Sequence, residues 1–135
     1  MKVSLVMPTI NVTTELELFL KSLKTQTYRD FELIVVDQNE GNEVFEIVKN
    51  YEEEFKIKYA KSDEKGLSLN RNRGLVLMEG EIVGFPDDDC EYQPDTLEKV
   101  VAFFEKKKDY RIYSCRTLER GKTYGTGVME KKDME

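Results

Sequence analysis

The stretch Val3-Ser4-Leu5-Val6-Met7-Pro8 is typical of a short buried β-strand that the proline brings to an end. Similar apolar runs lie at Phe31 to Val36 and at Glu81 to Phe85, and a weaker run lies at Ile57 to Ala60. Arg111 to Cys115 is predicted to form a fifth strand. These runs are the predicted strands, and the segments between them decide the fold class.

The segments between the strands carry helical patterns. In three of them apolar residues recur at i, i+3, i+4 and i+7, which places these residues on one face of a helix. They are Leu16, Phe19, Leu20 and Leu23, then Val44, Ile47, Val48 and Tyr51, then Leu97, Val100, Val101 and Phe104. The predicted helix-capping residues are Thr14 with Glu17, Ser68, and Asp95 with Glu98. The helix that Ser68 begins is predicted to run to about Met78.

Strand and helix alternate along the chain, which indicates right-handed βαβ units and a mainly parallel sheet with helices on both faces. The predicted fold class is therefore α/β. From Thr117 onward the pattern stops, and a polar, glycine-spaced stretch follows without a predicted closing element. We accordingly expect one α/β domain over residues 1–116 and the start of a second region over residues 117–135.

The composition argues against several classes of function. Asp and Glu number 27 against 21 Lys and Arg, and the basic residues are scattered, so we expect no nucleic-acid-binding surface. The chain has no histidine, and Cys90 and Cys115 are too few for a structural zinc site. No apolar run reaches the length of a signal peptide or a membrane span. Free thiols and the absence of targeting signals favour a cytoplasmic location.

The segment Phe85-Pro86-Asp87-Asp88-Asp89 is the strongest functional signal. In an extended segment Asp87 and Asp89 face one side and Asp88 faces the other. Two carboxylates on one side repel each other, and a divalent cation keeps both ionised near pH 7. Oxygen ligands without His or Cys favour Mg²⁺, Mn²⁺ or Ca²⁺ over zinc. The alternative interpretation is an exposed acidic turn.

Other polar residues are predicted to meet these acids at one edge of the sheet, because ligands of open α/β sheets bind at the carboxyl ends of the strands. The first strand leads into Pro8-Thr9-Ile10-Asn11, and the second ends at Asp37. Arg71 and Arg73 lie near the start of a predicted helix, where an arginine is suited to grip a diphosphate or a base edge. The alternative interpretations are a surface helix for the arginines and a cap or turn residue for Asp37.

Four segments, in this order, resemble motifs of family 2 glycosyltransferases. Pro8-Thr9-Ile10-Asn11 resembles the P-T-Y-N opening of that family, and Val35-Val36-Asp37 resembles its V-V-D-D-G-S turn. Gly66 to Gly74 resembles its G-x-x-x-A-R-N-x-G segment, and Phe85 to Asp89 is similar to its F-L-D-x-D. The match covers nearly the whole chain. It implies a Rossmann-like GT-A fold of which this chain is the nucleotide-sugar-binding half.

The resemblance also implies roles for individual residues. Thr9 and Asp37 would contact the nucleoside, and Arg71 would bind the nucleotide. Asp87 and Asp89 would hold Mn²⁺ or Mg²⁺, with Asp89 as the main ligand. The full set of predicted nucleotide-sugar-binding residues is Pro8, Thr9, Asn11, Asp37, Arg71, Asp87 and Asp88.

Three positions depart from the family pattern. Ile10 stands where an aromatic residue is usual, Gln38 replaces the second acid of the turn, and Cys90 follows the last motif where another acid is common. These departures bear on the choice of base and sugar.

The reaction that the resemblance implies is the inverting transfer of a sugar from a nucleotide-sugar, a UDP-sugar by preference, to an acceptor hydroxyl. The family supplies the general base, together with the acceptor site, from the second half of the domain, so no catalytic residue is expected here. We therefore expect a truncated donor-binding fragment that is inactive alone and self-associates through uncovered surface. The expected acceptor is a saccharide or glycolipid, met in the cytoplasm or at the inner face of the membrane.

Two other functions stay open. A sugar nucleotidyltransferase shares the substrate class, although it would begin with a glycine-rich loop followed by arginine. A non-catalytic module would hold a nucleotide-sugar or dock a partner chain. The glycine-rich turn of a dinucleotide-binding domain and the G-x-x-x-x-G-K segment of a P-loop enzyme are both absent from the sequence.

Overall fold

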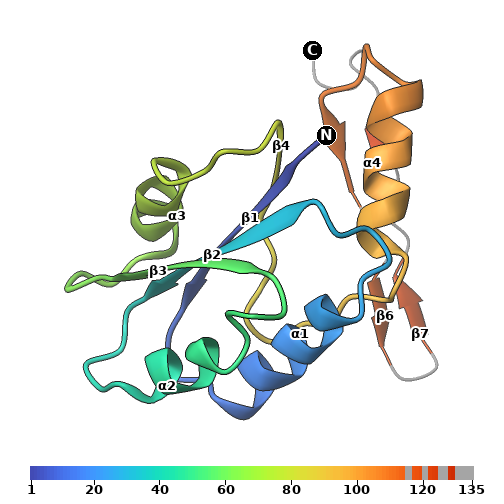
Figure 1. The fold of residues 1–135 in the computed structure, drawn as a ribbon. Coiled ribbons are helices and arrows are strands. Elements are labelled where there is room, and N and C mark those ends of the chain that lie inside the picture. Colours follow the sequence, from blue (N-terminus) through green and yellow to red (C-terminus); the bar gives the residue numbers. More distant parts are fainter. Residues whose placement is uncertain (115–116, 120–121, 125–127, 130–135) are drawn as a thin grey trace. The chain divides into compact units, whose positions relative to one another are not determined.

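The computed structural model of the chain describes residues 1–114, 117–119, 122–124 and 128–129. Helices and strands alternate over most of this length (Figure 1). In chain order the elements are β1 (Val3–Thr9), α1 (Thr14–Lys24), β2 (Phe31–Asp37), α2 (Glu43–Lys49), β3 (Lys56–Lys61), α3 (Leu67–Leu75), β4 (Ile82–Gly84), α4 (Thr96–Lys106), β5 (Ile112–Tyr113), β6 (Thr117–Glu119), β7 (Lys122–Tyr124) and β8 (Val128–Met129).

A four-stranded parallel sheet lies at the centre of residues 1–98, with strand order β3-β2-β1-β4. The register pairs Val3 with Phe31 and with Ile82, so these three strands begin at one edge of the sheet. Helix α3 covers one face, and α1 and α2 cover the other (Figure 1). The predicted α/β class, with helices on both faces of a parallel sheet, is confirmed.

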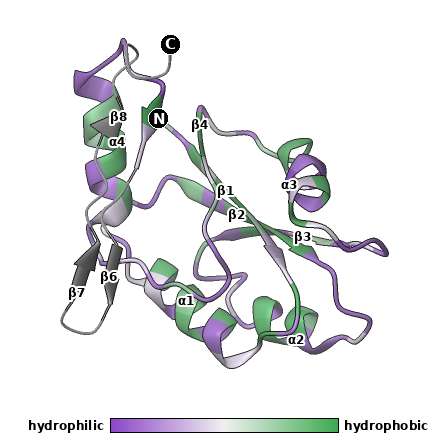
Figure 2. Ribbon diagram, turned by 180° about the vertical axis from the view of Figure 1, so that it is seen from behind, coloured by the Kyte–Doolittle hydropathy of each residue, from purple (hydrophilic) through white to green (hydrophobic). Residues whose placement is uncertain are grey.

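Apolar residues make up the middle of β1 and β2 (Figure 2), and all of them are buried. On the α3 face Val6, Ile34 and Val36 form a buried cluster that the end of α3 packs against. Gly74 permits this close approach, because a Cβ there would lie 2.4 Å from Val6 Cγ1. Helix α1 buries its four predicted apolar positions completely; they are Leu16, Phe19, Leu20 and Leu23. The two central strands are buried at every position, as expected for a parallel sheet covered on both sides.

Two helix starts differ from the prediction. Helix α1 begins at Thr14 itself, and the preceding Thr13 makes no side-chain capping hydrogen bond, so the predicted capping box is wrong. Helix α3 begins one residue before Ser68 and ends at Leu75, short of the predicted end near Met78. Its N-cap is Gly66, whose backbone φ of 145° is rarely adopted by residues that carry a Cβ atom. Backbone geometry therefore sets the start of α3.

The C-terminal part also differs from the prediction. The predicted fifth strand does not extend the parallel sheet: β5 pairs antiparallel with β8, and β6 pairs with β7. Cys115, the predicted end of that strand, lies outside the described residues. The chain divides into two compact units, residues 1–98 and residues 99–135. The functional boundary predicted at residue 116 remains a prediction.

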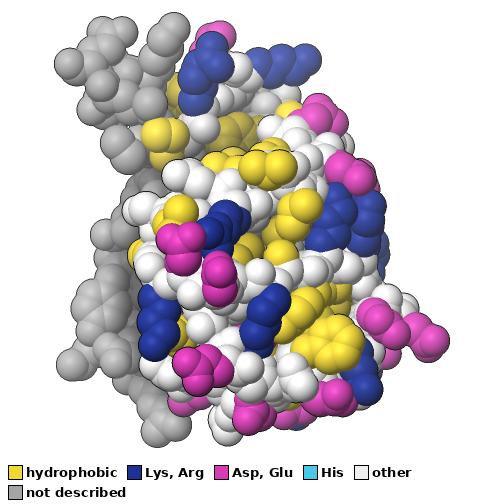
Figure 3. Space-filling model, turned by 90° about the vertical axis from the view of Figure 1, so that its left-hand side faces the viewer, with side chains coloured by type: hydrophobic (Ala, Val, Ile, Leu, Met, Phe, Trp, Pro, Cys, Tyr) yellow, Lys and Arg dark blue, Asp and Glu magenta, His cyan; other side chains and the backbone are white. Residues whose placement is uncertain are grey.

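Charge is mixed on the face of the molecule that Figure 3 draws. Lys and Arg side chains alternate there with Asp and Glu, and hydrophobic side chains lie between them. The described residues on this face therefore form no continuous basic stripe of the kind that holds a nucleic-acid backbone. No helix in the described part of the chain is long and apolar enough to cross a membrane.

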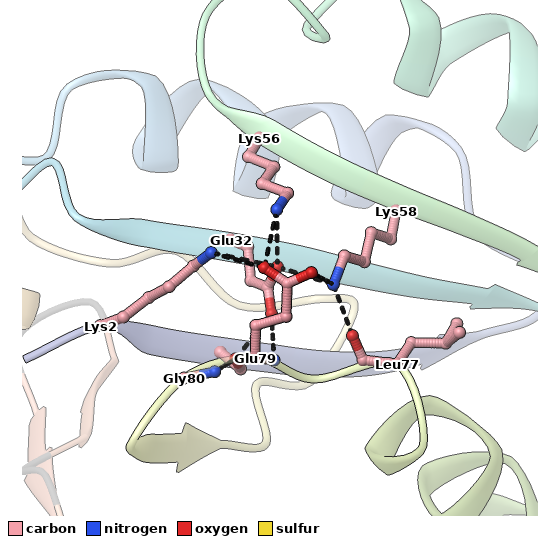
Figure 4. A network of polar contacts seen from close by, with 8 residues as sticks. Lys2, Glu32, Lys56, Lys58, Leu77, Glu79 and Gly80 are labelled. Atoms are coloured by element: carbon pink, nitrogen blue, oxygen red, sulfur yellow. Dashed lines mark hydrogen bonds and ion pairs between the residues drawn. The ribbon is translucent and has the colours of Figure 1, made fainter.

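An ionic cluster around the buried Glu32 joins the start of the sheet to the loop that follows α3 (Figure 4). Glu32 of β2 is fully buried, and its Oε2 lies 3.1 Å from Lys58 Nζ. Its Oε1 accepts hydrogen bonds from Ser4 Oγ and from the Glu79 backbone N–H, both at 2.8 Å. The Glu79 carboxylate in turn lies 3.0–3.1 Å from the ammonium groups of three lysines, Lys2, Lys56 and Lys58. The cluster thus ties the loop before β4 to the other three strands.

Acid is expected to weaken this cluster. Hydrogen bonds from Lys56, Lys58 and Lys2 lower the pKa of Glu79 to about 2. Burial alone would raise the pKa of Glu32, but its hydrogen bonds from Glu79 N–H, Ser4 and Lys58 outweigh burial and lower it. A lowered folded-state pKa stabilises the fold above the unfolded value near 4.3, and this stability is lost as pH falls toward the folded pKa. We therefore expect the thermal unfolding midpoint to fall between about pH 4.5 and pH 2.

The control for this prediction is a pair of matched variants. Glu79→Gln removes the titrating group, so the variant should be less stable at pH 7 and should lose less further stability on acidification. Glu40→Gln changes an exposed acid in the loop after β2 and should keep the wild-type acid profile. Equal acid sensitivity of wild type and Glu79→Gln would show that the cluster is not the cause.

Candidate functional site

A pocket of about 350 Å³ opens at the carboxyl edge of the sheet. Four loops contribute to it: those that follow β1, β2 and β4, and the one that leads into α3. Its lining residues are Pro8, Ile10, Gln38, Lys65, Gly66, Leu67, Pro86, Asp87 and Asp88. The volume is within the range of small-ligand sites, and the position is where open α/β sheets bind ligands.

The sheet order decides which groups meet in the pocket. Because β1 lies between β2 and β4, the loop after β1 is flanked on one side by Gln38 and on the other by the acids that follow β4. Hydrogen bonds hold the loops together: Asn11 N donates to Asn39 Oδ1 at 2.9 Å, and Gln38 N donates to Thr9 O at 3.0 Å. Asn11 has a φ of 61°, so the chain turns sharply where it leaves β1.

The acidic segment differs in conformation from the prediction. Strand β4 ends at Gly84, and Asp88 and Asp89 lie in a turn, so the alternation of an extended chain does not reach them. Asp87 and Asp89 are nevertheless exposed, whereas Asp88 is half-buried and its Oδ2 accepts a hydrogen bond from Ile10 N at 3.4 Å. Asp88 thus connects the acidic turn to the β1 loop and leaves the other two carboxylates at the surface.

Arg71 lies beside the acidic turn. One of its terminal nitrogens is 4.0 Å from Asp87 Oδ1, and its guanidinium lies 5.4 Å from the centre of the Phe85 ring. The Nε atom of Arg71 is buried and has no hydrogen-bond partner among the described residues. A buried donor without a partner is costly, so a ligand that accepts from it would be stabilised.

Arg73, two residues further along the helix, is used differently. Its guanidinium donates to Ser62 Oγ and, at 2.8 Å, to Glu64 Oε1, and it lies 3.6 Å from Asp63. These contacts hold the loop between β3 and α3. Arg71, beside the acidic turn, therefore has an unused donor, whereas the donors of Arg73 are occupied by contacts within the loop before α3.

Asp37 is fully buried and does not line the pocket. Tyr59 Oη donates to its Oδ2 at 2.5 Å, and Lys61 Nζ lies 3.3 Å from the same oxygen. Its Oδ1 accepts from both the backbone and the side chain of Asn39 at 2.9 Å. Burial and the hydrogen bond to Asp37 raise the pKa of Tyr59 far above its ordinary value, which keeps the phenol a donor. Asp37 therefore orients the β2 loop.

Thr9 and Cys90 are also placed by the structure. Thr9 is buried, and its Oγ1 has no hydrogen-bond partner among the described residues. Cys90 is a free thiol whose Sγ lies 3.0 Å from Asp87 O. Burial, opposed in part by that hydrogen bond, raises the pKa of Cys90 to about 11, so the thiol stays protonated and is a poor nucleophile at neutral pH.

The carboxylates of Asp87 and Asp89 suit a divalent cation whose remaining coordination positions are filled by a bound ligand and water. No cluster of three or more His, Cys, Asp or Glu side chains in the described part of the chain is arranged to hold a metal ion. Asp87 lines the pocket and is exposed, and Asp89, two residues further along the same turn, is exposed as well. Mg²⁺ is commonly bound in this way, by one or two carboxylates together with substrate phosphates and water. The residues present therefore fit Mg²⁺ or Mn²⁺.

Some of the predicted site residues line the pocket, together with residues that were not predicted. Pro8, Asp87 and Asp88 line it; Thr9, Asn11, Asp37, Arg71 and Asp89 do not. Asn11 lies in the loop after β1, and Arg71 lies in α3. The assignment of Thr9, Asn11, Asp37 and Arg71 as ligand contacts remains a prediction. The residues that sequence reasoning did not propose are Ile10, Gln38, Lys65, Gly66, Leu67 and Pro86.

Curated relatives share most of the chain. A GalNAc(5)-diNAcBac-PP-undecaprenol beta-1,3-glucosyltransferase of Campylobacter jejuni is 37% identical over 103 residues, which cover 74% of this chain and 33% of that protein. The poly(ribitol-phosphate) beta-N-acetylglucosaminyltransferase TarP of Staphylococcus aureus is 29% identical over 135 residues, which cover 96% of this chain and 41% of that protein. The chain thus spans well under half the length of both.

Solved structures share the fold. Staphylococcus aureus TarS 1-349 in complex with UDP-GlcNAc aligns with a TM-score of 0.75 and 30% identity over 80% of this chain and 32% of that chain. Its complex with UDP aligns with the same TM-score and identity, over 33% of that chain. The family model described as Glycosyl transferase family 2 matches residues 4–131. With the four motifs placed around one pocket, this match shows that the chain belongs to glycosyl transferase family 2.

Proposed function

We propose that this chain binds the donor of a glycosyltransferase that moves a sugar from a UDP-sugar to an acceptor hydroxyl with inversion. The observation that carries the proposal is the pocket at the carboxyl edge of the sheet, with Asp87 and Asp88 on one side and the neutral amide of Gln38 on the other. TarS, a structural neighbour, has been solved with UDP and with UDP-GlcNAc. Both ligands are uridine nucleotides, which supports uracil as the base.

Asp87 and Asp89 would hold Mn²⁺ or Mg²⁺, with Asp89 as the main ligand. Such a cation neutralises charge on a diphosphate leaving group when it is bound. Arg71 would bind the nucleotide, because it lies beside Asp87 and its buried Nε has no partner among the residues that the structure describes. Apolar groups from Pro8, Ile10 and other lining residues would shield the donor from water.

The acceptor and the general base complete the proposed reaction. The acids at this pocket are assigned to the cation or, for Asp88, to the β1 loop. The base and the acceptor site would therefore come from outside the described pocket. The names of the two curated relatives include an undecaprenol-linked glycan and poly(ribitol-phosphate). We propose a saccharide or glycolipid acceptor, reached from the cytoplasm or the inner face of the membrane.

Binding of UDP in the presence and absence of Mn²⁺ tests this function. A ligand at about 100 times its Kd stabilises a fold by about 2.7 kcal/mol, which moves the unfolding midpoint of a domain of this size by several degrees. We expect such a shift with UDP and Mn²⁺ and a much smaller one with UDP and EDTA. No shift with UDP, CDP, GDP or ADP under either condition would contradict donor binding and favour a partner-docking module.

A further inference from the structure

Gln26, the second residue after helix α1, is buried and uses its whole side-chain amide. Only 3% of the residue is exposed. Its Nε2 donates to Ser22 O at 3.1 Å and to Gln93 O at 2.7 Å. Its Oε1 accepts a hydrogen bond from Leu97 N at 3.1 Å. Both amide donors are therefore used, and the oxygen satisfies one of the N–H groups that the first turn of α4 leaves without a helical partner.

Further contacts hold the segment between the acidic turn and α4 against the end of α1. Ser22 Oγ donates to Phe19 O at 2.6 Å and accepts from Tyr92 N at 3.1 Å. Thr27 N donates to Pro94 O at 2.8 Å. The Tyr92 ring meets the buried Phe19 ring edge-on, with the ring centroids 5.3 Å apart. This segment is therefore fixed on the C-terminal end of α1.

Asp89 lies between two points at which the backbone is held. Asp88, directly before it, is joined to the loop after β1 by the hydrogen bond at 3.4 Å. Tyr92, three residues after it, is joined to α1. The side chain of Asp89 is exposed and forms no hydrogen bond or ion pair with a described residue. The position of its carboxylate therefore depends on the backbone between these two points.

We propose that Gln26 and Ser22 are positioning residues for the cation that Asp89 would hold. This inference rests on the proposed function, because it assumes a divalent cation at Asp89. Mg²⁺ requires near-ideal octahedral geometry, so a loosely held carboxylate binds it less well. Groups that orient metal ligands without touching the metal commonly contribute about 10- to 100-fold in metal affinity. Helix α1, which supplies none of the lining residues of the pocket, would in this way control how well the site binds its cation.

The variants Ser22→Ala and Gln26→Met test this inference. Alanine removes only the hydroxyl that holds Tyr92 N, and it is well tolerated in a helix. Methionine keeps the unbranched shape of glutamine but makes none of its hydrogen bonds. Measured by calorimetry, each variant should lose about tenfold of the UDP affinity that wild type has in Mn²⁺. UDP affinity in EDTA should stay at the wild-type value, because the contacts that do not involve the cation are unchanged.

Ser4→Ala is the matched control for Ser22→Ala. The Ser4 hydroxyl also donates to one oxygen and accepts from one backbone N–H, but its partners are Glu32 and Gly80, near the edge of the sheet where the strands begin. This variant should have a lower unfolding midpoint and the wild-type dependence of UDP binding on Mn²⁺. An equal loss of Mn²⁺ dependence in Ser4→Ala would identify general destabilisation as the cause and would overturn the proposal.

Two other results with folded variants would contradict the proposal. Unchanged Mn²⁺ dependence in Ser22→Ala and Gln26→Met would exclude a role in positioning the cation. A loss of UDP affinity that is as large in EDTA as in Mn²⁺ would place the effect on the nucleotide instead. Wild type that binds UDP equally well in Mn²⁺ and in EDTA, or does not bind it, would overturn the proposed function rather than this inference alone.

If neither variant folds, hydrogen exchange of the wild-type protein replaces them. The amides of Tyr92 and Leu97 donate to α1 and to the residue that follows it. A cation at Asp89 and these hydrogen bonds would hold the same short segment, so UDP with Mg²⁺ should slow the exchange of both amides more than UDP with EDTA does. Equal exchange under the two conditions, in a protein that binds UDP more tightly with Mg²⁺, would overturn the proposal.

Discussion

Replacing Asp89 with Asn is expected to remove most of the Mn²⁺-dependent part of UDP affinity while leaving the fold intact. The substitution keeps the shape of the side chain and one oxygen, but it removes the charge that attracts the cation. Asp89 is exposed, so its neutralisation costs no buried contact. Without the cation, the diphosphate of UDP would meet the negative charge of the remaining acids.

Calorimetry of UDP binding in Mn²⁺ and in EDTA measures this effect. For wild type, affinity should be much higher in Mn²⁺, and for Asp89→Asn the two values should be close together. Asp63→Asn is a matched control, because Asp63 is an exposed aspartate that lies against Arg73 and does not line the pocket. If wild type binds UDP equally well in EDTA, the assignment of a metal to Asp87 and Asp89 is wrong.

Asp88 provides a contrast within the same turn. Its carboxylate accepts the Ile10 N–H, so it contributes to the position of the β1 loop. Asp88→Asn keeps an oxygen for that hydrogen bond and should leave the Mn²⁺ dependence in place. The sequence places three consecutive aspartates here, and the structure gives the middle one a separate structural role.

The parallel sheet could be predicted because its central strands are buried on both faces and carry continuous apolar runs such as Phe31 to Val36. The start of α3 could not be predicted in the same way, since it depends on the φ of Gly66 rather than on the side chain of Ser68. The pairing of β5 with β8 is a contact between short segments distant in sequence, for which periodicity gives no signal.

The sequence did not show which side chains at the strand ends point into the pocket, and this limited the prediction of the site. Asp37 stands at the end of a strand, where an acid is suited to bind a nucleoside. Its carboxylate is enclosed by Tyr59, Lys61 and Asn39, and its contact with a nucleoside remains a prediction. The neighbouring Gln38 lines the pocket. One feature of the sequence indicated this difference. Side chains alternate between the two faces along a strand, so Gln38 is expected on the same face as Val36, which packs against the end of α3.

Arg71→Ala is expected to weaken UDP binding about tenfold or more, whereas Arg73→Ala should change it little. A hydrogen bond to a charged group contributes about 1.5–3 kcal/mol, and Arg71 has a buried Nε that lacks a partner in the described part of the chain. Arg73 already donates to Ser62 and Glu64. Its removal should lower the stability of the loop before α3 without removing a ligand contact.

The two arginines are separated by one residue on the same helix, so the pair distinguishes ligand binding from general electrostatics. If positive charge alone attracted the diphosphate, both variants would lose affinity by a similar amount, and salt would reduce both losses. If Arg71 binds directly, its loss should persist at high salt, and Arg71→Lys should restore only part of the affinity, because lysine lacks the planar fork of donors. Without UDP, Arg73→Ala should have a lower unfolding midpoint than Arg71→Ala, although Arg71→Ala should lose more UDP affinity. An equal loss of UDP affinity in both, or a larger loss in Arg73→Ala, would contradict the placement of the nucleotide beside Arg71.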